Sequence, residues 1–275
     1  MTRILRCAST TSAALAPRRA RRRNLSLIGP PGSGKGTYGA HFARSLDVPL
    51  VTVSDLLRAL RPDLSARLSA GQLVDDVVVG ETVLRGLREL REGRRGYVLD
   101  GFPRSARQAT LMAAWPPALR VASAVHLRVP DFVCRAKMLG RRACSRCGKS
   151  FNMNGVRSGK WDLPAVLPAE GRACAARASE DGGSDDGSDD GSGASCDWSV
   201  RRDDDTPEIV EERLRTYHLH ADPVLEYFKN GKDGGGGGGG GGGDGLYRLL
   251  TLTPHRGFKD LPSLIRKLHS FIDED

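Results

Sequence analysis

A glycine-rich segment with a lysine near its end, Gly29–Thr37, constrains the fold of this chain more than any other feature. It reads Gly-Pro-Pro-Gly-Ser-Gly-Lys-Gly-Thr and follows a short apolar run, Asn24–Ile28. The apolar run predicts a buried strand, and a helix is expected from about Gly34 to Ser45. In such a strand–loop–helix unit, backbone N–H groups converge on phosphate oxygens and the helix N-terminus adds positive potential. The segment therefore predicts a phosphate-binding loop.

The residue types of this loop suit a nucleoside triphosphate carried with Mg²⁺. A lysine can reach the β- and γ-phosphates, and a threonine hydroxyl can face the magnesium shell. The alternative is a glycine-rich turn with an incidental lysine, which the strand–turn–helix context disfavours. The residues predicted to bind the triphosphate, which the family resemblance below identifies as ATP, are Gly29, Gly32, Ser33, Gly34, Lys35, Gly36 and Thr37.

Short apolar runs alternate with helical patterns along the rest of the chain. Because such alternation is typical of parallel sheets covered on both faces, we expect an α/β fold of three layers. Pro223 is expected to break the helix that begins at Pro207 and runs to about His220. Further strands are predicted at Gly96–Asp100, Ala122–Val129 and Leu246–Leu252. Further helices are predicted from Ser54 to Pro62, at Val83–Leu90 and at Leu261–Ile272.

The net charge of +9 comes mostly from the N-terminus, where residues 1–23 hold seven arginines and no acid precedes Asp47. Arg, Ser, Thr and Ala dominate this stretch, as in organellar transit peptides, which predicts a mitochondrial or plastid location. A disordered tail or a mispredicted start codon, with a cytoplasmic location, is the alternative. Because the basic excess is so localised, no nucleic-acid partner is expected. No run of about 18 apolar residues occurs, so no membrane span is expected either.

Two low-complexity segments interrupt the globular pattern. Residues 178–195 are mostly Asp, Ser and Gly, and residues 231–245 include ten consecutive glycines. Neither composition can bury a core, so we expect both to be loop expansions. Between Arg142 and Arg202 no regular structure is predicted.

The placing of Gly36 between Lys35 and Thr37 makes the loop resemble that of adenylate kinases and closely related nucleoside monophosphate kinases. The resemblance covers residues 24–275, with the two interruptions. It implies a P-loop parallel sheet with two inserted segments: a monophosphate-binding segment at 53–82 and a lid at 141–203.

The activity implied by the resemblance is the reversible, Mg²⁺-dependent transfer of a phosphoryl group from ATP to AMP, giving two ADP. The family also implies a monomer. Three alternatives stay open: a kinase for UMP or CMP, a GTP:AMP phosphotransferase, and a non-catalytic nucleotide-binding relative.

Three stretches resemble the part of the family that binds the monophosphate: Val53–Arg58, Gly71–Val74 and Leu99–Arg104. An arginine can clamp a phosphate bidentately, and the amide of Gln108 can read the adenine edge. Asp100 ends a predicted strand, where ligands bind in open α/β sheets, so its carboxylate can order the waters of Mg²⁺ together with Thr37. The implied AMP-binding residues are Ser54, Arg58, Leu73, Val74, Gly101, Arg104, Gln108, Arg202 and Arg213.

The lid implied by the resemblance begins at Gly140. Arg141 matches a family arginine that contacts ATP phosphates, and Lys137 stands where the family often has an arginine packed on adenine. At the lid exit, Asp204 and Asp205 match the acidic pair that positions two arginines on the transferred group. The catalytic residues implied are Lys35, Arg104, Arg141, Arg202 and Arg213.

The lid also contains cysteines. Cys144 and Cys147 have the spacing of a zinc-knuckle half-site, and Cys174 and Cys196 are the candidates for its second half. One interpretation is a structural zinc bound by these four thiols. The other is a metal-free lid with reduced thiols.

Overall fold

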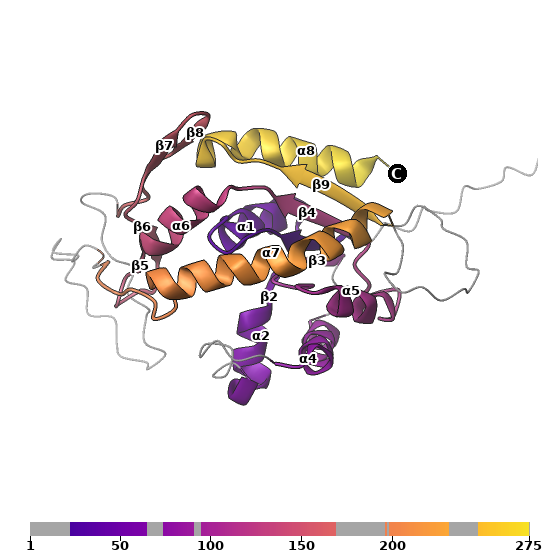
Figure 1. Ribbon diagram of the computed structural model, residues 1–275. Coiled ribbons are helices and arrows are strands. Elements are labelled where there is room, and N and C mark those ends of the chain that lie inside the picture. The colour runs from indigo at the N-terminus through magenta and orange to yellow at the C-terminus, as the bar shows by residue number, and fades with distance from the viewer. Residues whose placement is uncertain are drawn as a thin grey trace, which may run out of the picture.

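The computed structural model shows a central sheet enclosed by helices (Figure 1). The described residues are 23–64, 74–90, 95–168, 196, 198–230 and 247–274. Several positions discussed above lie outside them, namely segment 1–22, Gly71–Leu73, Cys174, residues 178–195 and residues 231–246.

Five parallel strands form the central sheet, in the order β2-β3-β1-β4-β9. The predicted strands are present, and β2 is an additional short strand that its three residues did not reveal. β1 begins at Arg23, one residue earlier than expected, where the backbone N–H donates to the carbonyl of Arg95 at 3.0 Å. The strands are β1 (Arg23–Ile28), β2 (Leu50–Thr52), β3 (Gly96–Asp100), β4 (Ser123–Leu127) and β9 (Arg248–Leu252).

Helices cover both faces of this sheet, which confirms the three-layer α/β prediction (Figure 1). One apolar cluster joins α1 and α8 to the sheet, and a second joins α2, α4, α5 and α7 to its opposite face. The helices are α1 (Lys35–Leu46), α2 (Val53–Leu60), α4 (Asp76–Glu89), α5 (Ala106–Ala113), α6 (Asp131–Leu139), α7 (Pro207–Asn230) and α8 (Leu261–Asp273), with a 3₁₀ turn η1 (Gly257–Asp260).

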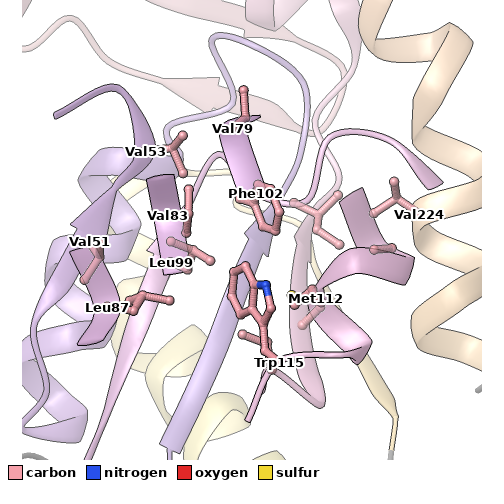
Figure 2. Packing of buried hydrophobic residues seen from close by; sticks show 14 of the residues in the cluster. Val51, Val53, Val79, Val83, Leu87, Leu99, Phe102, Met112, Trp115 and Val224 are labelled. Atoms are coloured by element: carbon pink, nitrogen blue, oxygen red, sulfur yellow. The ribbon is translucent and has the colours of Figure 1, made fainter. Parts of the chain in front are cut away.

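Side-chain alternation along the strands explains the two clusters. Leu25 pairs in register with Val98, and both belong to the cluster that faces α1 and α8. The next residue of β3, Leu99, points to the other face, as the two-residue period of a strand requires. There Phe102 stacks on Trp115 with ring centroids 5.4 Å apart (Figure 2). Each buried side chain of this size stabilises the fold by about 1.5–3 kcal/mol.

Two helix predictions need correction. The helix expected at Val83–Leu90 begins two turns earlier, at Asp76, because Asp75 caps it by accepting the N–H of Val77 at 2.8 Å. Pro223 does not break its helix, since α7 continues through it to Asn230.

The expectation of no regular structure between Arg142 and Arg202 is wrong for its first part. Two short hairpins occur there, β5 (Arg141–Ala143) with β6 (Ser150–Asn152) and β7 (Val156–Ser158) with β8 (Trp161–Leu163). Strands of three residues are too short to show a periodic pattern. Side chains of the second hairpin pack against α6 and α7, which anchors the lid to the main body. Among the described residues, no helix has the length and apolarity to cross a membrane.

Candidate active site

The glycine-rich loop connects β1 to α1 at the carboxyl end of the sheet. Gly32 and Gly34 adopt left-handed conformations, with φ of 82° and 87°. A side chain at Gly32 is also excluded by space, because its Cβ would lie 2.4 Å from the carbonyl oxygen of Cys134 in α6. No side chain caps the N-terminus of α1, and its first turn has no acidic residue. Its N–H groups can therefore bind an anion.

Lys35 folds back over this loop. Its ammonium donates hydrogen bonds to the carbonyls of Gly29 at 2.7 Å and Pro30 at 2.9 Å. Burial lowers the pKa of Lys35 to about 8; Arg104 and Arg213 also lower it, while Asp100 opposes the shift. The lysine is thus held among other cations, where a phosphate would stabilise its charged form.

Ser33 belongs to the same loop and has a buried hydroxyl. Its Oγ accepts or donates no hydrogen bond within the part of the chain that is described. Because buried hydroxyls are nearly always satisfied, this O–H suits a phosphate oxygen at the loop.

Asp100 ends β3 beside the loop. Its Oδ2 lies 3.6 Å from where a Cβ on Gly36 would be, in ordinary contact with the start of α1. Burial raises the pKa of Asp100, and Lys35 and Arg104 oppose that shift. Thr37 is exposed one residue further along α1. A carboxylate and a hydroxyl next to a phosphate loop are hard oxygen groups that suit hydrated Mg²⁺.

Arg104 bends back toward the end of β3. Its Nε donates to the carbonyl of Gly101 at 2.9 Å. Gly101 has a φ of 91°, and a Cβ there would lie 2.9 Å from Arg104 Nη2, so a larger residue would displace the guanidinium. Desolvation of its guanidinium lowers the pKa of Arg104; Asp100 opposes this shift, and Arg213 adds to it.

Gln108 is buried in the first turn of α5. Its Oε1 accepts the backbone N–H of Arg104 at 2.8 Å, and its Nε2 donates to Asp76 at 2.7 Å. Ser105 caps the same helix by accepting the N–H of Gln108 at 3.1 Å. The amide predicted to read a base is therefore held from two sides.

The segment between β2 and α4 contributes exposed groups. Arg58 and Ser54 lie on exposed positions of α2, and Arg58 forms an ion pair with Asp55. α2 begins at Val53, directly after Thr52, which pairs in register with Asp100, so the start of this helix lies beside the end of β3. Val74 packs against the apolar cluster under the segment.

A buried carboxylate organises the arginines of the lid. Asp205 is fully buried, and its Oδ2 lies 3.2 Å from Arg141 Nε and its Oδ1 3.8 Å from Arg213 Nη1. Asp204 binds the same Arg213 nitrogen at 2.7 Å. Burial raises the pKa of Asp205, and Arg141 opposes the shift. Arg202 is exposed, and its positive charge contributes to lowering the pKa of Arg141 and opposes the raised pKa of Asp205.

Arg213 connects the lid to the phosphate loop. Its charge lowers the pKa of Lys35 on one side and of Arg141 on the other. Five predicted cations therefore either lower the pKa of another cation or have their own pKa lowered by one. They are Lys35, Arg104, Arg141, Arg202 and Arg213.

Lys137 is placed differently from the expectation of a residue packed on adenine. Its ammonium donates to the carbonyls of Asn154 at 2.7 Å and Pro164 at 2.9 Å, which belong to the lid. Contact with a nucleotide would require these bonds to be exchanged. In the structure Lys137 ties α6 to the lid.

Three of the four predicted metal-binding cysteines lie together in the lid. Cys144, Cys147 and Cys196 have sulfur atoms within 4.8 Å of one another, and the Cys147 and Cys196 sulfurs are 3.6 Å apart. Cys144 and Cys147 lie in a tight turn, in which the backbone carbonyl of Cys144 accepts the N–H of Gly148 at 3.0 Å. An antiparallel bridge between Ala143 and the lid exit brings Cys196 to the pair.

Asp76 is a part of this site that the sequence did not reveal. It lies at the start of α4, where two aspartates before an apolar run look only like a helix-capping signal. Its hydrogen-bond partner Gln108 is 32 residues away, so no local pattern could pair them.

Comparisons with known proteins agree with this geometry. A family model described as adenylate kinase matches residues 27–233. The chain is 32% identical over 218 residues to the chloroplastic adenylate kinase 1 of Arabidopsis thaliana, covering 74% of this chain and 67% of that one. It is 31% identical over 213 residues to an adenylate kinase of Solanum tuberosum, with coverage of 74% and 67%. An adenylate kinase of Clostridium tetani is 30% identical over 216 residues, with coverage of 75% and 87%.

The lowered pKa of Lys35 predicts how ATP binding depends on pH. Above about pH 8 the ammonium of the unliganded protein loses its proton, so affinity for Mg²⁺-ATP should fall by up to about tenfold per pH unit. Bound phosphate should raise the pKa again, so binding at pH 8.5 should take up a proton. Calorimetry in buffers of different ionisation enthalpy measures both effects. Lys35→Ala should bind weakly and without proton uptake; wild-type affinity that is constant from pH 7 to 9 would contradict the prediction.

Proposed function

This chain belongs to the adenylate kinase family, and from that premise we propose which of its residues carry the transfer of a phosphoryl group from ATP to AMP. The expected family and enzyme class, a nucleoside monophosphate kinase, are confirmed. The observation that carries the residue assignment is the buried carboxylate of Asp205, which lies 3.2 Å from Arg141 and 3.8 Å from Arg213. The charge of Arg213 also lowers the pKa of Lys35 in the phosphate loop.

On the donor side, the loop glycines and the N-terminus of α1 bind the phosphates of ATP. Lys35 exchanges its carbonyl partners for phosphate oxygens, and Ser33 supplies a buried O–H. Arg141 reaches the same phosphates from the lid, where Asp205 holds it. Lys137 supports this side by keeping the lid attached to α6.

On the acceptor side, Arg58 and Arg104 bind the phosphate of AMP, and Gln108 reads the adenine. Ser54, Leu73, Val74 and Gly101 line the pocket in this proposal. Arg202 and Arg213 lie between the two nucleotides and neutralise the charge that spreads over the transferred group.

The reaction needs little covalent chemistry from the protein. An oxygen of the AMP phosphate attacks the γ-phosphorus of ATP, that P–O bond forms, and the bond to the β–γ bridging oxygen breaks, so that two ADP result. Because the attacking oxygen is already anionic, no side chain has to remove a proton. The arginines also displace water, which would otherwise accept the phosphoryl group.

Asp100 and Thr37 fit the role of holding the hydration shell of Mg²⁺. A buried carboxylate at the end of β3 faces the loop, and oxygen groups are the ligands this ion prefers. When bound, Mg²⁺ supplies positive charge to the β- and γ-phosphates.

Three cysteines and Cys174 form the proposed site of a structural zinc in the lid. Zinc–thiolate bonds of about 2.3 Å in a tetrahedron place sulfurs about 3.8 Å apart, and the 3.6 Å between Cys147 and Cys196 fits that arrangement. Zinc here would join the β5–β6 turn to the lid exit.

The activity is tested with a chain that begins at Arg23. We expect ADP formation from ATP, Mg²⁺ and AMP, with kcat lowered by at least about 100-fold in Lys35→Ala because the phosphates lose a cation in the transition state. UMP, CMP and GMP as acceptors and GTP as donor are assayed in parallel. Faster turnover with another acceptor or donor would show that the enzyme's preferred substrates are not ATP and AMP. ATP binding without turnover by any combination would favour the non-catalytic alternative.

The zinc proposal is tested by metal analysis of the full chain. We expect about one zinc per chain, and a thermal midpoint lowered by roughly 5–10 °C when a chelator removes it. Cys147→Ser should lose the metal. Cys134→Ala, which changes a buried cysteine outside the cluster, should keep it. A metal-free chain whose midpoint is insensitive to chelator would support the alternative of reduced thiols.

The location we propose is the plastid, supported by the chloroplastic name of the Arabidopsis relative and by the arginine-rich composition of residues 1–23. A fluorescent protein fused after the first 46 residues should accumulate in plastids. Accumulation in mitochondria would replace the plastid with the mitochondrion as the location, and fluorescence in the cytoplasm would refute the proposed transit peptide. We also propose a monomer, which light scattering of the purified chain tests.

A further inference from the structure

The carboxylate of Asp76 is hydrogen-bonded at both of its oxygens. Its Oδ1 accepts from Gln108 Nε2 at 2.7 Å, and its Oδ2 accepts from the hydroxyl of Ser105 at 2.6 Å. Ser105 Oγ in turn accepts the backbone N–H of Gln108 at 3.1 Å. The three residues form a closed ring that joins the start of α4 to the start of α5.

This ring fixes which way the Gln108 amide faces. A backbone N–H can only donate, so the atom that meets the N–H of Arg104 has to be the oxygen. A carboxylate can only accept, so the atom that meets Asp76 has to be the nitrogen. The reversed amide would place two donors together on one side and two acceptors together on the other. The buried amide therefore has one stable orientation.

A fixed amide distinguishes two classes of purine. Each amide atom keeps one further position, an N–H on Nε2 and a lone pair on Oε1. A 6-amino purine presents a donor at its 6-position beside an acceptor at N1, and a 6-oxo purine presents the reverse. An amide that can rotate by 180° forms hydrogen bonds with either base. An amide held in one orientation forms them with one base and places donor against donor and acceptor against acceptor with the other.

We propose that Asp76 is a positioning residue that makes the monophosphate site select a 6-amino purine over a 6-oxo purine by holding the Gln108 amide in one orientation. The inference rests on the proposed role of Gln108 in reading the base. Asp76 itself acts through Gln108 and needs no contact with substrate.

The test compares kcat/KM for AMP with kcat/KM for IMP, its 6-oxo counterpart, on one preparation of each variant. The ratio does not depend on how much of the enzyme is folded, so it separates selectivity from stability. Asp76→Asn keeps the shape of the side chain and removes the obligate acceptor. Asp75→Asn is the matched control, because it makes the same change one residue earlier. Asp75 caps α4 and faces the exposed Arg107, and asparagine also caps well.

We expect Asp76→Asn to lower the AMP/IMP ratio by about tenfold, mainly through a raised KM for AMP, with kcat nearly unchanged. The control should stay within about twofold of wild type. A wild-type ratio in Asp76→Asn would overturn the proposal and leave Asp76 as a connection between two helices.

A third variant separates this proposal from the one on which it rests. If Gln108→Ala leaves the ratio unchanged, Gln108 reads no base, and the assignment of the AMP pocket fails together with this inference. If Gln108→Ala lowers the ratio and Asp76→Asn does not, only the role of Asp76 is refuted. If both lower it, the double variant should lose no more than Gln108→Ala alone, because the two residues act through one contact.

Discussion

Repulsion among like charges is the constraint on which this site depends. The charge of Arg213 lowers the pKa of Lys35, of Arg104 and of Arg141 in the lid, and Arg104 also lowers the pKa of Lys35. Without nucleotides these cations can only be held together by carboxylates and by rigid backbone. Asp100 and the two aspartates before α7 supply the negative charge, and the strands and helices that end at this edge supply the rigidity. In the proposed reaction the phosphates of ATP and AMP would complete the neutralisation, so that binding energy and catalysis would draw on the same arrangement.

The lid is part of that arrangement and not a separate unit. Asp205 is fully buried while it holds two arginines, so its charge is stable only in their company. Lys137 binds lid carbonyls, and Trp161 packs in the same apolar cluster as Val210 of α7. These contacts attach the lid to α6 and α7, and Asp205 holds Arg141 and Arg213 together beside the start of α7.

The sequence predicted those parts of the molecule that are encoded locally. The phosphate loop and the strand ending at Asp100 are continuous motifs, so their residues and their edge of the sheet could be inferred together. Pro223 was misjudged because its effect is decided by tertiary packing. A proline inside a helix costs about 3 kcal/mol, yet burial of Val224 and Phe228 in the next turn offsets that cost. Asp76 was missed because its partner lies in another helix.

The long insertion in the lid is compatible with this arrangement, because described residues on both sides of the insertion are bridged to the β5–β6 hairpin. Val166 bridges Asn152 on one side, and Val200 bridges Ala143 on the other. For a chain between two fixed ends, the entropy of closure grows only with the logarithm of length, about 0.6 kcal/mol for each doubling. Added residues between Val166 and Val200 therefore weaken the lid very little, whereas loss of the bridge between Val200 and Ala143 would release the segment that carries Cys196 and Arg202.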